Sequence, residues 1–158
     1  MTLTPQIAIA RTDSDDPAFR ELVVLLDRDL RERDGEEHSF YAQFNKIDMI
    51  RNAVVAYLDG EAVGCGAFKE YQPGPHGSVE IKRMFVKPEQ RGKRIAVNIL
   101  SELEKWASEL GYGEFVLETG KKQPEAIRLY ERNGYQLIPN YGQYAGVENS
   151  VCMKKTIA

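Results

Sequence analysis

The chain has 158 residues, with 21 Lys and Arg against 24 Asp and Glu, so its formal net charge is −3. This length suits one domain with one hydrophobic core, and we expect residues 1–158 to form a single domain. The excess of acid argues against a protein that coats nucleic acid or an anionic membrane. No stretch approaches the roughly 18 apolar residues of a membrane helix, and the N-terminus carries no secretory signal. We therefore expect no nucleic-acid or membrane partner.

The cysteines and histidines are too few for most metal enzymes. Cys65 and Cys152 are the two cysteines, and His38 and His76 are the two histidines. Two cysteines make neither a disulfide framework nor a four-ligand zinc site. We expect reduced thiols on small buried residues, surface histidines, a cytoplasmic location and no metal site.

The first half of the chain is predicted to form four strands and two helices. Asp16 before Pro17 is typical of a helix start, and apolar residues then recur every three or four positions until Gly35 ends the pattern. Asp59-Gly60 between two apolar runs predicts a hairpin. The predicted strands are 6–11, 53–58, 62–71 and 78–86, and the predicted helices are 17–35 and 39–46.

The second half is predicted to form two helices and three strands. Gly111 and Gly134 are the expected helix stops. The predicted helices are 94–110 and 124–132, and the predicted strands are 115–118, 135–138 and 150–154. The order βααβββαβαββ indicates an α/β (α+β mixed) domain with about seven strands in a central mixed, mostly antiparallel sheet and about four helices.

The most informative stretch is residues 79–96, where a strand leads through a short basic loop into a long helix. The first N–H groups of a helix have no internal partner and favour anions such as phosphate. Arg91, Lys93 and Arg94 add positive charge, and Gly92 and Ala96 keep side-chain bulk away from a ligand. A solvated basic surface is the alternative. The magnesium-binding hydroxyl of an NTPase loop and the glycine pattern of a dinucleotide site are both absent.

Residues 91–96, Arg-Gly-Lys-Arg-Ile-Ala, resemble the acyl-CoA-binding loop Arg/Gln-x-x-Gly-x-Gly/Ala of the GCN5-related N-acetyltransferases (GNAT family). Arg94 departs from the central glycine of that motif. Residues 126–135 resemble the family's Ala-x-x-Leu-Tyr-x-x-x-Gly-Phe signature, and Gln123 replaces a frequent asparagine. The predicted element order is also that of the family, across nearly the whole chain.

The resemblance implies a GNAT-like fold and acetyl-CoA as cosubstrate. It implies a bulge in the strand before the loop, with the backbone of residues 84–86 paired to the pantetheine arm. The acetyl carbonyl would lie near the Met84–Phe85 backbone, whose N–H can polarise it. The implied cofactor-binding residues are Met84, Phe85, Val86, Arg91, Gly92, Lys93, Arg94, Ile95, Ala96 and Gln123.

The resemblance also implies direct attack of an amine on the acetyl thioester. An amine with a pKa near ~10.4 must first lose a proton. Glu80 is the candidate base; its alternative role is to pair with Lys82 or to bind substrate. Glu118 and a water relay are rival routes for the proton. Tyr130 matches the family tyrosine that protonates the leaving thiolate, and its alternative role is that of a core residue.

The expected acceptor is the primary amine of a small molecule. Glu118, Tyr141 and Tyr144 are candidates to bind it, although the tyrosines equally suit a loop packed on its own aromatic rings. A peptide or protein amine is one alternative. A regulator that binds acyl-CoA without turnover is another, motivated by Arg94 and Gln123. Dimers are common in the family, so a homodimer is an expected assembly.

Overall fold

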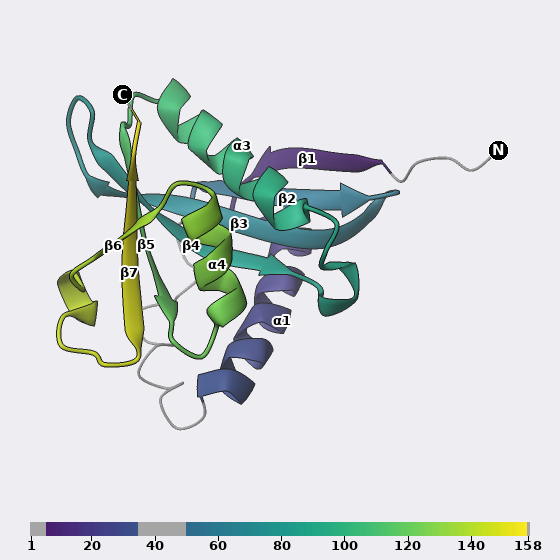
Figure 1. The fold of residues 1–158 in the computed structure, drawn as a ribbon. Coiled ribbons are helices and arrows are strands. Elements are labelled where there is room, and N and C mark those ends of the chain that lie inside the picture. The colour runs from purple at the N-terminus through teal and green to yellow at the C-terminus, as the bar shows by residue number, and fades with distance from the viewer. Residues whose placement is uncertain (1–5, 35–49, 158) are drawn as a thin grey trace. The chain divides into compact units, whose positions relative to one another are not determined.

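Seven strands form a mixed sheet in the order β1-β2-β3-β4-β5-β7-β6 (Figure 1). The structure is a computed structural model and describes residues 6–34 and 50–157. The chain divides into two compact units, Met1–Ala67 with Arg83–Leu103 (the N-terminal unit) and Phe68–Lys82 with Glu104–Ala158 (the C-terminal unit). The strands β3 (Glu61–Gln72) and β4 (Ser78–Val86) and the helix α3 (Ile95–Glu109) each contribute residues to both units. The α/β class and the mixed sheet confirm the expected fold.

The N-terminal unit begins with β1 (Ile7–Thr12), α1 (Pro17–Asp34) and β2 (Asn52–Leu58). β1 and β2 are antiparallel. The two-residue turn between β2 and β3 has positive φ at Asp59 (50°) and Gly60 (87°), the geometry of a type I′ hairpin turn. The Asp59-Gly60 prediction is therefore confirmed, and β2 and β3 each begin within one residue of their predicted positions.

The helix α1 begins as its sequence predicts. The Asp16 carboxylate accepts a hydrogen bond from the Ala18 N–H at 2.9 Å, which satisfies one of the free donors of the first turn. The helix packs its apolar stripe on β2, β3 and β4. This core contains Phe19, Leu22, Val23, Leu26, Ile50, Ala53, Val55, Cys65, Ala67 and Phe85. The helix predicted at 39–46 lies outside the described residues.

Two glycines of β3 let α3 approach the sheet within the N-terminal unit. A Cβ at Gly66 would lie 2.7 Å from the Met84 sulfur and 2.8 Å from an Ile99 methyl. A Cβ at Gly64 would lie 2.9 Å from the Phe85 carbonyl oxygen. Because the strand alternates, these glycines face α3 while Cys65 faces the α1 core. Figure 1 shows α1 and the start of α3 on opposite sides of these strands.

The C-terminal unit contains β5 (Glu114–Gly120), α4 (Pro124–Arg132), β6 (Gln136–Ile138) and β7 (Ser150–Thr156). β4 pairs in parallel with β5 from Ser78↔Glu114 to Ile81↔Leu117. β7 is antiparallel to both β5 and β6. Phe115, Leu117 and Met153 are buried, and Phe68 meets Trp106 edge to face at 5.6 Å.

Glycine ends α3 and α4 as predicted. Gly111 has φ 99° and Gly134 has φ 95°. After Gly134, the Tyr135 N–H donates to the Tyr130 carbonyl at 3.0 Å, which is the longer bond of a Schellman motif. The Tyr112 N–H makes the same bond to Ala107 at 3.1 Å. The strand predicted from residue 135 therefore starts at Gln136, because the Tyr135 amide still caps α4.

The Gly66→Ala substitution tests the close approach of α3. The new methyl meets atoms under 3.0 Å away, so we expect a loss of about 2 kcal/mol in the free energy of unfolding. Urea titration measures the loss. Gly113→Ala is the matched control, because its Cβ would make only ordinary contacts at 3.6 Å or more. Equal midpoints for the two variants would contradict the proposed packing constraint.

Candidate active site

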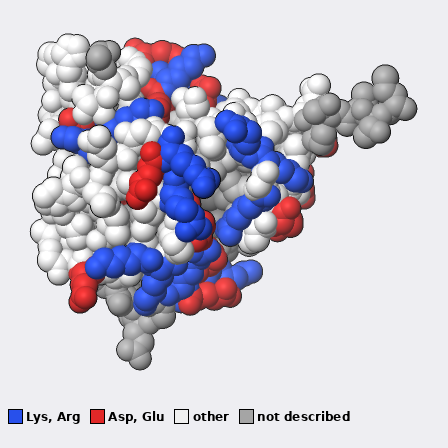
Figure 2. Space-filling model, viewed as in Figure 1, with Lys and Arg blue, Asp and Glu red and all other residues white. Residues whose placement is uncertain are grey.

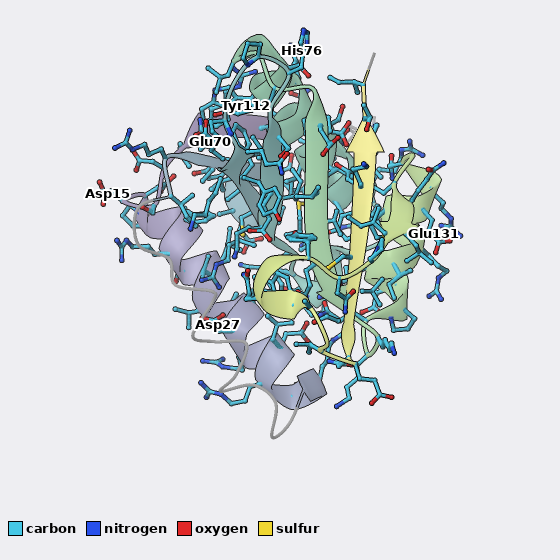
Figure 3. All side chains as sticks on the ribbon, turned by 90° about the vertical axis from the view of Figure 1, so that its left-hand side faces the viewer. Asp15, Asp27, Glu70, His76, Tyr112 and Glu131 are labelled. Carbon is cyan, nitrogen blue, oxygen red and sulfur yellow. The ribbon has the colours of Figure 1, made fainter. Side chains whose placement is uncertain are left out.

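The strand β4 is irregular at Arg83, in the part that belongs to the N-terminal unit. Arg83 has φ 60°, a left-handed conformation typical of a bulge inside a strand. Its guanidinium is 2% exposed and lies 3.2 Å from the Asp27 carboxylate on α1; Figure 3 labels Asp27. Its carbonyl accepts the Cys65 S–H at 3.3 Å. The side chain and the carbonyl of Arg83 therefore both make contacts that stabilise this irregular backbone. Its position agrees with the bulge that the resemblance implies.

The basic loop after β4 is held by its own contacts. The Lys87 N–H donates to the Val63 carbonyl at 2.9 Å, and a short 3-10 turn, η2 (Pro88–Gln90), follows. Arg91 Nε donates to the Val86 carbonyl at 3.0 Å, and its guanidinium lies over the Phe85 ring at 5.9 Å.

Two left-handed residues direct the chain from the loop into α3. Gly92 has φ 84° and Arg94 has φ 64°. The Arg94 carbonyl accepts the Asn98 N–H at 3.1 Å, so Arg94 is the N-cap and the helix begins at Ile95, one residue later than predicted. The amides of residues 95–97 precede the first helical bond and suit an anion. No atom would lie within 4 Å of a Cβ at Gly92, which leaves space beside these amides.

The basic side chains of the loop differ in their partners. Lys87 lies 3.9 Å from Glu61, Arg91 lies 3.9 Å from Asp29, and Lys93 donates to the Gln90 side-chain oxygen at 2.7 Å. Arg94 is exposed. Figure 2 shows basic and acidic side chains side by side on the viewed face. The loop thus combines the amides of the helix start with cations whose ion pairs to Glu61 and Asp29 are long, an arrangement that suits an anion.

In the C-terminal unit, Glu80 of β4 has two polar neighbours. The Tyr141 hydroxyl donates to Glu80 Oε2 at 2.7 Å. Lys82 Nζ lies 3.7 Å from Oε1, and the Glu80 and Lys82 side chains are 12% and 8% exposed. Lys82 therefore pairs with Glu80, which is the alternative role considered for this glutamate, and the Tyr141 hydroxyl binds the same carboxylate.

Glu118 of β5 lies on the same face of the sheet as Glu80. Glu80 is paired with Val116, two residues from Glu118, and side chains two apart share a face. Cys152 of β7 is directly opposite Glu118. The Ser150 hydroxyl donates to Glu118 Oε2 at 2.7 Å. The C-terminal unit thus places the two carboxylates on one face of the sheet.

The remaining acceptor candidates form an aromatic cluster. Tyr141 meets Tyr71 at 5.0 Å and Tyr144 at 5.7 Å, both edge to face. Burial, and then the Glu80 charge, raise the pKa of both Tyr141 and Tyr144. Burial raises the pKa of Cys152 to about 11, so its thiol stays protonated at neutral pH.

Tyr130 is buried on α4. Burial, and then the Glu118 charge, raise the pKa of its phenol. Its ring lies 5.7 Å from Tyr135, whose hydroxyl donates to Glu104 at 2.8 Å. Lys155 pairs with the other Glu104 oxygen at 2.8 Å. Gln123 caps α4 through its backbone and makes no side-chain cap bond.

Sequence reasoning missed several partners of these residues. They are Asp27 for Arg83, Ser150 for Glu118, and Glu104 with Lys155 beside Tyr135. Each contact joins positions far apart in the chain, so no local spacing signals it. His76 is exposed as expected. Figure 3 shows Tyr112 beside Glu70, to which its hydroxyl donates at 2.6 Å.

Known proteins are similar to this chain in sequence and in fold. The profile of the "Acetyltransferase (GNAT) family" matches residues 19–135. The chain belongs to the GNAT family. An IAA acetyltransferase from Azospirillum brasilense is 33% identical over 97% of this chain and 99% of its own. A structure assigned as an acyl-CoA N-acyltransferase from Klebsiella pneumoniae superposes with a TM-score of 0.79, 28% identity and coverage of 97% and 99%.

Two further GNAT-fold structures are known with ligand. The PaiA N-acetyltransferase from Thermoplasma acidophilum, with coenzyme A, has a TM-score of 0.69, 19% identity and coverage of 96% and 99%. A GNAT acetyltransferase from Elizabethkingia anophelis, with acetyl-CoA, has a TM-score of 0.66, 16% identity and coverage of 96% and 98%. The expected family and enzyme class are confirmed: the chain is an acyl-CoA-dependent N-acyltransferase, with acetyl-CoA as cosubstrate.

Two features are absent from the part of the chain that the structure describes. In residues 6–34 and 50–157, no three His, Cys, Asp or Glu side chains are grouped to hold a metal ion. In the same ranges, no helix has the length and apolar character to cross a membrane.

Substitutions at Arg94 test the left-handed N-cap. Arg94→Gly and Arg94→Ala both remove the charge, but only glycine adopts φ 64° without strain. We expect Arg94→Gly to be more stable than Arg94→Ala by about 1 kcal/mol in urea unfolding. Lys93 has no positive φ, so Lys93→Ala should be more stable than Lys93→Gly. The same order at both positions would contradict the assignment.

The buried tyrosines make the C-terminal unit sensitive to alkali. The pKa values of Tyr130, Tyr135, Tyr141 and Tyr144 are raised in the folded chain, whereas an unfolded phenol titrates near ~10. The resulting stabilisation is complete below about pH 10 and is lost as the pH rises further. The chain has eight tyrosines, and we expect these four to contribute their share of the tyrosinate absorbance only together with the loss of circular dichroism. A urea-unfolded sample gives the full tyrosinate absorbance as the control; the same full absorbance in a protein that keeps its circular dichroism would contradict the burial.

Proposed function

We propose that this chain transfers the acetyl group of acetyl-CoA to the primary amine of a small molecule by direct attack. The observation that carries the proposal is the left-handed Arg94. The arginine replaces the glycine of the family motif, which had motivated a regulator without turnover. Its φ of 64° is the conformation that glycine adopts readily, so the substitution gives no reason to expect a different loop.

The N-terminal unit supplies the proposed cofactor-binding residues. The amides of residues 91–96 and the cations Arg91, Lys93 and Arg94 bind the pyrophosphate. The backbone of residues 84–86, next to the irregularity at Arg83, pairs with the pantetheine arm. Its N–H groups polarise the acetyl carbonyl as negative charge develops on the oxygen. Bound acetyl-CoA supplies the activated thioester.

The C-terminal unit supplies the proposed acid–base residues. Glu80 takes the proton that the amine loses on attack, directly or through a water molecule. Glu118 lies on the same face and attracts the cationic form of the acceptor. A positioned base of this kind contributes roughly 10²–10⁴ in rate. The ordered Glu80 carboxylate, fixed by Tyr141 at 2.7 Å, supports this role.

Tyr130 assists the departure of the thiolate by donating a hydrogen bond. Its pKa is raised by burial, whereas a thiol has a pKa near ~8.5. Complete proton transfer from this phenol to the sulfur is therefore uphill. We propose that the hydroxyl stabilises the charge on the sulfur while the carbon–sulfur bond breaks, and that solvent supplies the final proton.

The acceptor is tested by measuring thiol release from acetyl-CoA across a panel of amines. The panel contains amino acids, polyamines, aminoglycosides and short peptides. IAA is included because the Azospirillum relative is named for it. Turnover of a small amine above the rate with peptides supports the proposal. Selective turnover of peptides would favour a peptide or protein acetyltransferase, and binding of acetyl-CoA without release on any amine would favour the regulator.

We also propose that residues 1–158 act as one GNAT-like domain in the cytoplasm. The Azospirillum relative aligns over 97% of this chain, which supports one domain, and the two thiols, both free, suit a reducing compartment. A homodimer, an assembly common in the family, is tested by sedimentation.

The Tyr130→Phe substitution tests the role of the phenol. A hydrogen bond to a charged sulfur is worth about 1.5–3 kcal/mol, so we expect kcat to fall roughly 10- to 100-fold. The dissociation constant of acetyl-CoA should change little, because the bond strengthens only as the thiolate forms. Stopped thiol-release assays and equilibrium titration measure the two quantities. An unchanged kcat would remove Tyr130 from the mechanism.

A further inference from the structure

We propose that Tyr141 is a positioning residue for Glu80, which fixes the carboxylate so that its Oε1 atom receives the proton of the acceptor amine. This inference rests on the proposed function, in which Glu80 acts as the base. Sequence analysis had placed Tyr141 among the residues that contact the acceptor. The structure instead directs its hydroxyl to Glu80 Oε2 at 2.7 Å.

The two oxygens of Glu80 are held differently. Oε2 accepts the short Tyr141 hydrogen bond. Oε1 lies 3.7 Å from Lys82 Nζ, beyond the length of a hydrogen bond. Lys82 is two residues along β4 and so shares the face of Glu80. Oε1, which accepts no hydrogen bond from either residue, therefore has both of its lone pairs available to an amine, and the lysine charge stabilises the carboxylate beside it.

Tyr141 is itself held firmly enough to position another group. The centroid of its ring lies 5.0 Å from that of Tyr71 and 5.7 Å from that of Tyr144. Tyr144 is 2% exposed, and its N–H donates to the Tyr141 carbonyl at 2.9 Å. The Asn140 side chain donates to the carbonyls of Val147 and Ser150, which closes the segment that carries Tyr141.

The hydroxyl of Tyr141 acts as a donor toward Glu80. Burial and the Glu80 charge both raise its pKa, so the phenol keeps its proton at neutral pH. A protonated phenol beside a carboxylate donates its hydrogen bond to that carboxylate. The tyrosine thus orients Glu80 without taking part in the proton transfer.

A double-mutant cycle distinguishes positioning from direct contact with the acceptor. The variants are Tyr141→Phe, Glu80→Gln and the double substitution, assayed by thiol release with an amine that the wild-type protein acetylates. We expect Tyr141→Phe to lower kcat roughly 10- to 50-fold, within the range of general-base catalysis. The KM values for the amine and for acetyl-CoA should stay within about threefold, because a positioning residue acts on the transition state.

The double variant distinguishes the two roles of Tyr141. If Tyr141 acts through Glu80, its removal costs nothing further once Glu80 is replaced, and the double variant matches Glu80→Gln. Multiplied losses in the double variant, or a raised amine KM with an unchanged kcat in Tyr141→Phe, would overturn the inference. Tyr71→Phe is the matched control from the same ring cluster, and its kcat should stay within about twofold.

The failure of the inference differs from the failure of the proposed function. Wild-type protein that releases no thiol with any amine would contradict the proposed function itself, and a Glu80→Gln variant with full kcat would contradict the assignment of Glu80 as its base. Wild-type turnover, a slow Glu80→Gln variant and multiplied losses in the double variant would contradict the role of Tyr141 alone.

Discussion

The close approach of α3 to β3 is the constraint on which the N-terminal unit depends. Gly64 and Gly66 leave no side chain where α3 crosses, so Ile99 lies directly on the strand backbone. The start of α3 is thereby fixed near the end of β4. Residues 87–94 connect Val86 to Ile95, and left-handed residues direct the backbone into the helix. Gly92 and Arg94 supply them, and the free amides at the helix start follow from that geometry.

The strand β4 has a regular first part and an irregular part at Arg83, and the two parts have different proposed roles. Its regular first part alternates, so Glu80 and Lys82 share a face and form an ion pair in the C-terminal unit. At Arg83 the alternation is interrupted by a left-handed residue whose side chain is buried against Asp27. A charged arginine is costly to bury without a partner, so Asp27 is as necessary to this irregularity as the arginine. The backbone beyond it is the part that the family resemblance assigns to the cofactor.

Local signals were sufficient for the elements of the fold and insufficient for the contacts of the site. Several local signals determine the conformation of the neighbouring backbone and can be read from the sequence: Asp16, Asp59-Gly60, Gly111 and Gly134. The predicted strand included Tyr135, whose amide instead closes the cap of α4. The helix at 39–46 lies outside the described residues, and the roles of Glu80, Tyr130 and the loop stay predictions. The bond from Tyr141 to Glu80 joins residues 61 positions apart, and no spacing rule reports such a contact.

The Asp59-Gly60 turn also bears on the order in which the chain can fold. A two-residue turn closes the β2–β3 hairpin at the smallest loop entropy, and hairpins form in about 1–10 μs. Asp59 then exchanges hydrogen bonds with Gln6, one through its side chain and one through its N–H, both at 3.2 Å. The hairpin therefore provides a strand edge with which β1 can pair, and Asp59 fixes the start of that pairing. The parallel pair of β4 and β5 joins Ser78 to Glu114 and must wait for the intervening chain, so the N-terminal hairpin is the natural first template of the sheet.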